Sequence, residues 1–193
     1  KKMLTAPDGH IYSLPWIEEL GKGKESIHTV NSLGWINQKW LNKLGLSQPK
    51  TAKDLYDVLK AFKEKDPNGN GKKDEIPLSF MSSDDGNDLK MLFAAFGDGS
   101  GDNGQHLIVN NDGKVQFTTN TNAYKEAIKY LNKCYSEGLI DTESFEQDWS
   151  RYVAKGADEK YGLYFTWDPH NVTGPGDDYV MYQPLAREDG KIN

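Results

Sequence analysis

The chain has 193 residues, a net charge of −6 and a single cysteine, Cys134. The negative charge argues against binding to nucleic acid or to anionic membrane surfaces. One cysteine excludes an internal disulfide framework, and no apolar run approaches the length of a transmembrane helix. The length suffices for one domain with a sizeable core, or for one lobe of a larger protein.

The first part of the chain predicts two strands and two helices. In order, we expect a strand over Ile11–Trp16 after an Asp8-Gly9 turn, a loop over Gly21–Glu25, a strand over Ile27–Leu33, a short helix over Ile36–Leu44 ended by Gly45, and a helix opened by Pro49-Lys50-Thr51. Thr51 is the expected N-cap of that helix, with Asp54 near the positive end of its dipole. One buried face is predicted by apolar residues spaced i, i+3, i+4 and i+7, at Leu55, Val58, Leu59 and Phe62.

The remaining elements alternate between strands and helices. They are a strand over Ile76–Met81, a helix over Asn87–Phe96, a hairpin of His106–Val109 and Lys114–Phe117 around Asn111-Asp112-Gly113, a long helix over Asn122–Glu137 ended by Gly138, a helix over Ser144–Val153, and strands over Tyr161–Trp167 and Asp178–Gln183. This alternation predicts an α/β or mixed α+β fold with helices flanking a central sheet. Cys134 falls on the apolar side of the long helix, where we expect a buried structural thiol rather than a nucleophile.

An oxygen-rich loop joins the helix opened by Thr51 to the strand at Ile76. The sequence Asp66-Pro67-Asn68-Gly69-Asn70-Gly71-Lys72-Lys73-Asp74-Glu75 carries side-chain oxygens at alternate positions, followed by two carboxylates. Ca²⁺ takes about six to eight oxygen ligands, which a tightly coiled loop of this kind supplies. We therefore predict a structural Ca²⁺ site formed by Asp66, Asn68, Asn70, the Lys72 carbonyl, Asp74 and Glu75.

The loop follows the EF-hand pattern only through its ninth position, Asp74. The twelfth position is Pro77, where an EF-hand has a bidentate Glu, so Glu75 is expected to take that role. The alternative is a solvated turn between a helix and a strand, since Asn-Gly and Asp-x-Asn sequences are common in turns.

Five motifs stand in an order known from one family. They are Asp8-Gly9-His10-Ile11-Tyr12-Ser13-Leu14-Pro15, similar to a crossover strand reading D-G-K-x-Y-x-x-P; Trp35–Leu41, similar to a Y-N-K-x-L-L helix start; Pro49-Lys50-Thr51 with Asp54-Leu55, similar to P-x-T-x-x-E-L; the long helix through Ile140; and Tyr161–Trp167, similar to a strand that carries a binding-site aromatic. Over nearly the whole chain, this order resembles the extracellular solute-binding proteins of bacterial ABC importers. The resemblance is to the sugar- and oligosaccharide-binding type, especially the lipoprotein-like receptors of Gram-positive bacteria. Trp35 and Gln38 depart from the family's usual Tyr and Lys.

The resemblance implies a receptor of two α/β lobes joined by a hinge, with the ligand in the cleft between them. The chain is then expected to be one periplasmic-binding-protein-like lobe over residues 1–193, the second one, entered near residues 8–16 by a hinge crossover strand and left near 178–193 by a return strand. The whole receptor is expected to be a monomeric lipoprotein at the bacterial cell surface that works with the membrane permease of the importer. Similar calcium loops occur in oligosaccharide-binding members, which supports the Ca²⁺ prediction.

Candidate ligand contacts follow from how proteins bind sugars, which is by aromatic faces stacked on C–H surfaces and polar groups that satisfy hydroxyls. Trp167 is the best candidate for stacking, because it ends a strand and precedes a polar loop that begins with Asp168; core packing is the alternative. Trp16 and Glu18 lie near the expected hinge crossing. Open α/β sheets place ligands at loops that follow strands, which adds Ser82, Ser83, Asp84 and Asp85.

Two functions from other classes stay open. A carbohydrate-active hydrolase would need paired carboxylates, for which Glu18, Asp84 and Asp168 are available, although the sequence has no GxSxG, HExxH or P-loop motif. A calcium-dependent interaction module would need a second loop or an apolar groove opened by Ca²⁺. We expect a carbohydrate-binding protein without enzymatic activity.

Overall fold

In the computed structural model, the described residues are 4–12, 32–83, 88–97, 101–110 and 112–192. The chain divides into two units, residues 1–30 and 31–193. In the first unit the Asp8-Gly9 turn is confirmed, because the Gly9 N–H donates to the Ala6 carbonyl and Gly9 has a φ of 85°. Ile11 and Tyr12 do not form the predicted strand. Residues 13–31, which held the rest of that strand, the loop over Gly21–Glu25 and most of the next predicted strand, lie outside the described part.

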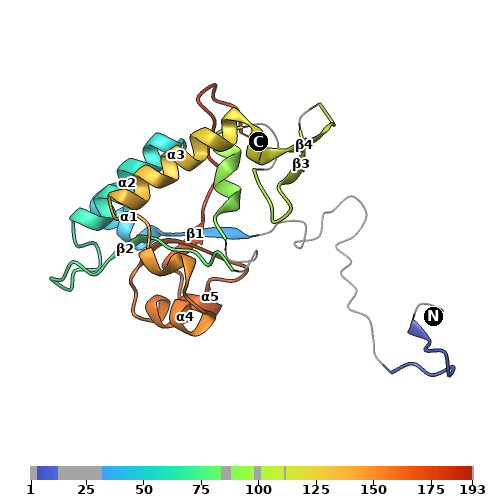
Figure 1. Ribbon diagram of the computed structural model, residues 1–193. Helices are drawn as coiled ribbons and strands as arrows, with labels where there is room; N and C mark the ends of the chain where they lie inside the picture. The colour runs from blue at the N-terminus through green and yellow to red at the C-terminus, as the bar shows by residue number, and fades with distance from the viewer. Residues whose placement is uncertain (1–3, 13–31, 84–87, 98–100, 111, 193) are drawn as a thin grey trace. The chain divides into compact units, whose positions relative to one another are not determined.

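A four-stranded mixed sheet forms the centre of the second unit (Figure 1). Its strands are β1 (Leu33–Asn37), β2 (Ile76–Leu78), β5 (Tyr161–Thr166) and β6 (Tyr179–Met181), in the order β2-β5-β1-β6. β5 is parallel to β2 and antiparallel to β1, and β1 is antiparallel to β6. Every residue of β5 is buried, as expected of a central strand covered on both faces. The predicted class, a mixed sheet flanked by helices, is confirmed.

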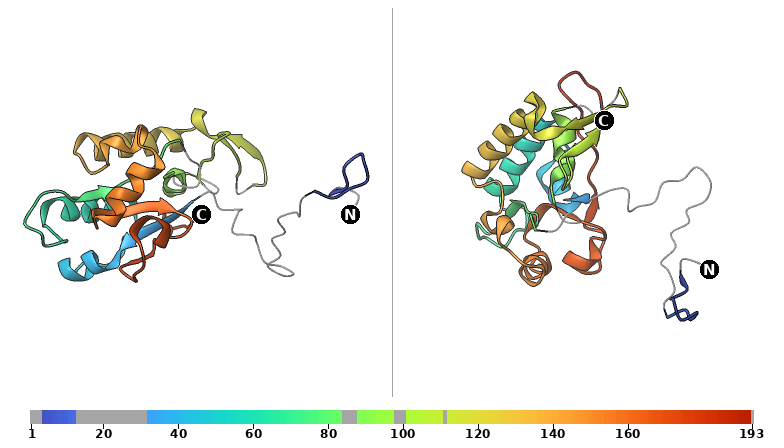
Figure 2. Two further views of the ribbon diagram at one scale, coloured as in Figure 1. Left: turned by 90° about the horizontal axis from the view of Figure 1, so that it is seen from below. Right: turned by 45° about the vertical axis from the view of Figure 1, so that its right-hand side comes forward.

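Helices cover both faces of this sheet (Figures 1 and 2). They are α1 (Gln38–Leu44), α2 (Ala52–Glu64), α3 (Asn122–Ser136), α4 (Trp149–Ala157) and the short α5 (His170–Thr173). α2 and α3 run side by side over one face, where Leu163 and Phe165 of β5 join the larger core cluster. α4 and α5 lie over the other face, where Tyr164 joins a second cluster. Among the described residues, no helix is both long and apolar enough to cross a membrane.

The start of α2 is as predicted. The Thr51 hydroxyl accepts from the Asp54 N–H, and the Asp54 carboxylate accepts from the Thr51 N–H, both at 3.1 Å. The predicted apolar face of this helix is buried. Gly45 and Gly138 follow α1 and α3 with positive φ values of 66° and 67°, and such conformations cost glycine least. The prediction of a buried Cys134 is also confirmed, and burial raises the pKa of its thiol to about 11.

The hairpin is confirmed as β3 (Leu107–Val109) and β4 (Val115–Phe117). Three predicted strands end earlier than expected: Ile76–Met81 stops at Leu78, Tyr161–Trp167 stops at Thr166, and Asp178–Gln183 shortens to Tyr179–Met181. The Ser79 N–H still donates to the Leu163 carbonyl of β5, but further on the Ser82 N–H donates to the Ser144 carbonyl instead.

Three predicted helices are wrong in extent or type. Ile36 and Asn37 belong to β1, because the Asn37 side chain caps α1 by accepting from the Trp40 N–H at 2.9 Å. The helix predicted over Asn87–Phe96 is a 3₁₀ helix, η4, over Lys90–Ala95. The helix predicted over Ser144–Val153 is two elements, the 3₁₀ helix η6 (Thr142–Phe145) and α4, because Asp148 caps a new helix by accepting from the Arg151 N–H at 2.8 Å.

Candidate functional site

The oxygen-rich loop coils around the side chain of Asp66. Its Oδ1 accepts from the backbone N–H groups of Gly69 and Asn70 at 2.9 and 3.1 Å, and its Oδ2 accepts from Gly71 at 3.1 Å. Asp66 itself has a φ of 47°, and Gly71 has a φ of 75°. Glycine adopts a positive φ at little cost, so Gly71 permits the sharp turn of this loop.

The two asparagines of the loop hold it in the same way. The amide oxygen of Asn68 accepts from the Asn70 N–H at 3.0 Å, and that of Asn70 accepts from the Lys72 N–H at 2.7 Å. An amide oxygen has two lone pairs, so each keeps one that a cation can take. The amide nitrogens donate to Asp74 Oδ1 at 3.2 and 3.0 Å, and these hydrogen bonds, from Asn70 first, lower the pKa of Asp74.

Glu75 is the exception in this loop, because its two carboxylate oxygens are buried and have no hydrogen-bond partner. Burial, followed by the charges of Asp66 and Asp74, raises the pKa of Glu75. A buried carboxylate without a donor is costly unless a proton or a cation neutralises it. The loop therefore fits a hard cation, with Glu75 as the group that most needs one.

The carboxylates of the loop do not form a finished metal cluster on their own. Within the described ranges, no three His, Cys, Asp or Glu side chains are arranged to hold a metal ion. A site here would therefore also need oxygens of other kinds, which the sequence predicts: the amide oxygens of Asn68 and Asn70 and the Lys72 carbonyl. In this structure the asparagines turn their nitrogens toward Asp74, so a bound cation would replace these two hydrogen bonds.

The predicted ligand residues divide into two groups. Trp16, Glu18, Asp84 and Asp85 lie outside the described residues. Ser82 and Ser83 follow β2 and are exposed, while Trp167 follows β5 and is half-buried. Leu78 of β2 lies opposite Leu163 of β5 in a parallel pair. Ser82 and Trp167 each come four residues later, so both segments leave the sheet at the same edge, where open sheets bind ligands.

Asp168 continues the loop after Trp167 and is exposed. Its Oδ1 accepts from the His170 N–H at 3.0 Å and lies 2.8 Å from the His170 Nδ1. These contacts, the backbone one first, lower the pKa of Asp168. The side chain is thus an ionised acceptor at the same sheet edge as Trp167.

A cavity of about 360 Å³ lies beside Ser82, lined by η4 and α3. This volume falls within the usual size of small-molecule pockets, about 300–1,000 Å³. Its walls are mainly aromatic and apolar, formed by Phe80, Phe93, Tyr124, Leu131, Tyr135 and Phe145. The sequence analysis missed this cavity, because its walls come from segments that the chain brings together only in the folded unit.

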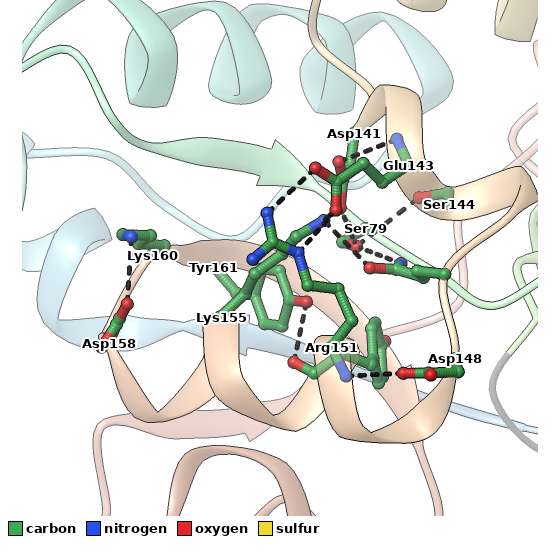
Figure 3. A network of polar contacts seen from close by, with 12 residues as sticks. Ser79, Asp141, Glu143, Ser144, Asp148, Arg151, Lys155, Asp158, Lys160 and Tyr161 are labelled. Atoms are coloured by element: carbon green, nitrogen blue, oxygen red, sulfur yellow. Dashed lines mark hydrogen bonds and ion pairs between the residues drawn. The ribbon is translucent and has the colours of Figure 1, made fainter.

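A network of polar side chains around Lys155 was also missed (Figure 3). Lys155 of α4 is buried, and its ammonium lies 2.7 Å from Asp141 and 2.8 Å from Glu143. Arg151 grips Glu143 with two hydrogen bonds, at 2.8 and 3.1 Å. Those contacts, from Arg151 and then Lys155, lower the pKa of Glu143 to about 2. A lysine in an amphipathic helix is normally exposed, so periodicity alone gave no sign of its burial.

Comparison with known proteins gives a consistent result. No family model matches the chain. Over 191 residues the chain is 58% identical to the fructooligosaccharide ABC transporter substrate-binding protein FusA of Streptococcus pneumoniae. This match covers 99% of this chain and 35% of FusA. It is 36% identical over 127 residues to lipoprotein LipO of Bacillus subtilis, covering 63% of this chain and 24% of LipO.

Solved structures agree with these relatives. S. pneumoniae FusA in complex with kestose matches with a TM-score of 0.86 and 57% identity, covering 99% of this chain and 38% of that one. A FusA EF-hand mutant in complex with fructo-nystose matches with a TM-score of 0.85 and 57% identity, covering 98% and 38%. The chain therefore spans little more than a third of the length of FusA, and about a quarter of that of LipO.

Proposed function

The chain belongs, as a segment, to the sugar- and oligosaccharide-binding proteins of ABC transporters, and we propose that the whole protein captures a fructooligosaccharide for import. The observation that carries the proposal is the 58% identity with FusA over 99% of this chain. Because the chain spans 35% of FusA, the ligand, the permease partner and the surface anchor are proposed for the whole protein. The name of LipO, a lipoprotein, supports the anchor.

The expected absence of enzymatic activity agrees with this family, since the similar proteins are substrate-binding components of transporters. The hydrolase alternative finds no support among them. We further propose that residues 1–193 form the second of two lobes, with the hinge crossing near 8–16 and the return strand near 178–193. The four-stranded sheet at the centre of the second unit, with helices on both faces, supports one lobe.

The proposed ligand surface is the sheet edge where β2 and β5 end. Trp167 stacks on a sugar ring, and Ser82, Ser83 and Asp168 bind hydroxyl groups. Exposed hydroxyls, an ionised carboxylate and a half-buried indole at one sheet edge are the combination that sugar recognition uses. Trp16, Glu18, Asp84 and Asp85 remain part of the proposal.

The test uses the full-length receptor and isothermal titration with kestose. Trp167→Ala should weaken binding by roughly thirtyfold or more, the size of an interface hot spot. Trp149→Ala is the matched control, because Trp149 is 43% exposed on α4, and it should bind kestose like the unmodified protein. If Trp167→Ala lowers the melting temperature but leaves kestose affinity unchanged, Trp167 is a core residue and the proposed surface is wrong.

We also propose that Ca²⁺ occupies the loop Asp66–Glu75 as a structural ion. The unpartnered buried oxygens of Glu75 support it, as does the EF-hand described in the FusA mutant. When bound, the ion supplies positive charge at this loop. Asp66, Asn68, Asn70, the Lys72 carbonyl, Asp74 and Glu75 would hold it, fixing the connection between α2 and β2.

A further inference from the structure

The buried ammonium of Lys155 has three polar partners. It contacts Asp141 at 2.7 Å, Glu143 at 2.8 Å and the amide oxygen of Gln147 at 3.0 Å. The contacts with Asp141 and Gln147 are hydrogen bonds, and the contact with Glu143 is an ion pair. The side chains of Lys155 and Asp141 are only 8% and 7% exposed. Three residues of one segment, 141–147, are thus fixed by one cation.

That segment in turn holds the backbone that follows β2 (Figure 3). The amide nitrogen of Gln147 donates to the Phe80 carbonyl at 2.7 Å, and the Phe80 N–H donates to the Ser144 hydroxyl at 3.2 Å. The Ser79 hydroxyl donates to Asp141 at 2.9 Å. Segment 141–147, which Lys155 contacts, therefore fixes the direction in which the chain leaves the sheet after β2.

Ser82, just before the exposed Ser83, also contacts segment 141–147. Its N–H donates to the Ser144 carbonyl at 3.1 Å, and its hydroxyl donates to the Phe145 carbonyl at 3.3 Å. Both donors of Ser82 are therefore engaged with the segment that Lys155 fixes. The hydroxyl oxygen keeps its acceptor lone pairs, so it can accept a hydrogen bond from a ligand group that donates, such as a sugar hydroxyl.

A purely stabilising role explains this arrangement poorly. A buried ion pair contributes little net stability compared with apolar residues of similar size, because desolvation offsets the attraction. Its stronger effect is to fix geometry, since the donors and acceptors are satisfied in one arrangement only.

We propose that Lys155 is a positioning residue for Ser82. Lys155 acts through segment 141–147 and so holds the Ser82 hydroxyl as a hydrogen-bond acceptor for a ligand hydroxyl. The inference rests on the proposed function, in that it assigns a role to Ser82 at the same sheet edge. It adds a buried residue that touches no ligand and yet sets the affinity.

The experiment is a double-mutant cycle in the full-length receptor, with kestose as the probe. Lys155→Met is combined with Asp141→Asn, so that no buried charge is left unpaired, and the pair is measured with and without Ser82→Ala. Lys160→Met is the matched control, because Lys160 pairs with the exposed Asp158 and contacts none of the side chains around Lys155 that Figure 3 joins by dashed lines. Hydrogen exchange at the Ser82 amide provides a measurement that needs no ligand.

We expect the Lys155→Met, Asp141→Asn pair to weaken kestose binding by about tenfold, the scale of one lost hydrogen bond. Ser82→Ala should weaken it by a similar factor, and all three changes together by little more, because they remove the same contact. The Ser82 amide should exchange faster in the pair and at an unchanged rate in Lys160→Met.

The inference would be overturned if the losses of kestose affinity from the Lys155→Met, Asp141→Asn pair and from Ser82→Ala multiplied when combined. An unchanged exchange rate of the Ser82 amide in the pair would overturn it as well. In either case the network would only stabilise the fold. Failure of the unmodified receptor to bind kestose would instead refute the proposed ligand. The Ser82 exchange rate would then still decide whether Lys155 holds this loop.

Discussion

Glu75 and Asp66 place two carboxylates in one loop, and burial together with the charge of Asp66 raises the pKa of Glu75. In the absence of a cation this arrangement is unfavourable, because the Glu75 oxygens are buried without donors. A bound Ca²⁺ would make the contribution of Glu75 to folding stability favourable, since the same oxygens would become ligands.

The first prediction is that Glu75→Gln has opposite effects with and without calcium. In chelator, the variant should melt at the same or a higher temperature than the unmodified protein, because a buried charge is removed. At a Ca²⁺ concentration about a hundredfold above the dissociation constant, the unmodified protein should gain about 2.7 kcal/mol, and the variant much less. Thermal unfolding in both conditions measures this, with the exposed Glu64→Gln as the control. Equal Ca²⁺ responses in the two proteins would exclude Glu75 as a ligand.

The second prediction concerns pH in the absence of calcium. The folded state holds the Glu75 proton more tightly than the unfolded chain, in which the ordinary pKa is 4.5. The contribution of Glu75 to stability should therefore fall as the pH rises from about 4.5 through the raised pKa. The opposite trend is expected from Asp74 and Glu143, whose pKa values are lowered, so their contributions are lost as the pH falls.

The difference between the unmodified protein and Glu75→Gln isolates this term. Urea unfolding across the acid range should show that difference shifting against the unmodified protein as the pH rises. With saturating Ca²⁺ the shift should disappear or change sign. A difference that stays constant with pH in chelator would mean that Glu75 ionises normally.

Local signals explain why part of the fold could be predicted from sequence. The N-cap and the apolar face of α2 involve residues close together in the chain, Thr51 with Asp54 and Leu55 with Phe62. The same holds for the Asp66–Glu75 loop. By contrast, the split of the helix predicted over Ser144–Val153 depends on a cap at Asp148 that competes with a continuous apolar pattern.

Sites built across long sequence separations could not be predicted in this way. Lys155 looks like an exposed helix residue until η6 brings Asp141 against it. The cavity beside Ser82 needs η4 and α3 together. Ser82 and Trp167 were both candidates, but only the parallel pairing of β2 and β5 shows that they leave the same edge.

The third prediction concerns the backbone approach inside β5. A Cβ atom at Gly162 would overlap Phe62 Cδ2 and would lie 2.8 Å from the Pro77 carbonyl oxygen. Backbone cannot move aside as a flexible side chain can, so Gly162→Ala should destabilise the fold by about 1–3 kcal/mol, the scale of core overpacking. Urea unfolding measures this loss. Wild-type stability in Gly162→Ala would show that β2 and β5 pack less closely than described.

Our last prediction separates the stability role of Lys155 from its positioning role. Lys155→Met alone leaves Asp141 buried at 7% exposure without its cation, and removing one partner of a buried pair costs about 3–5 kcal/mol. Lys155→Met with Asp141→Asn should recover most of this loss, because no unpaired charge remains. Urea unfolding of both variants and of Lys160→Met, which should stay near the unmodified protein, provides the comparison. Equal losses in the single and paired variants would show that the Lys155 stem, rather than its charge, holds segment 141–147, and the cation would then have no part in fixing Ser82.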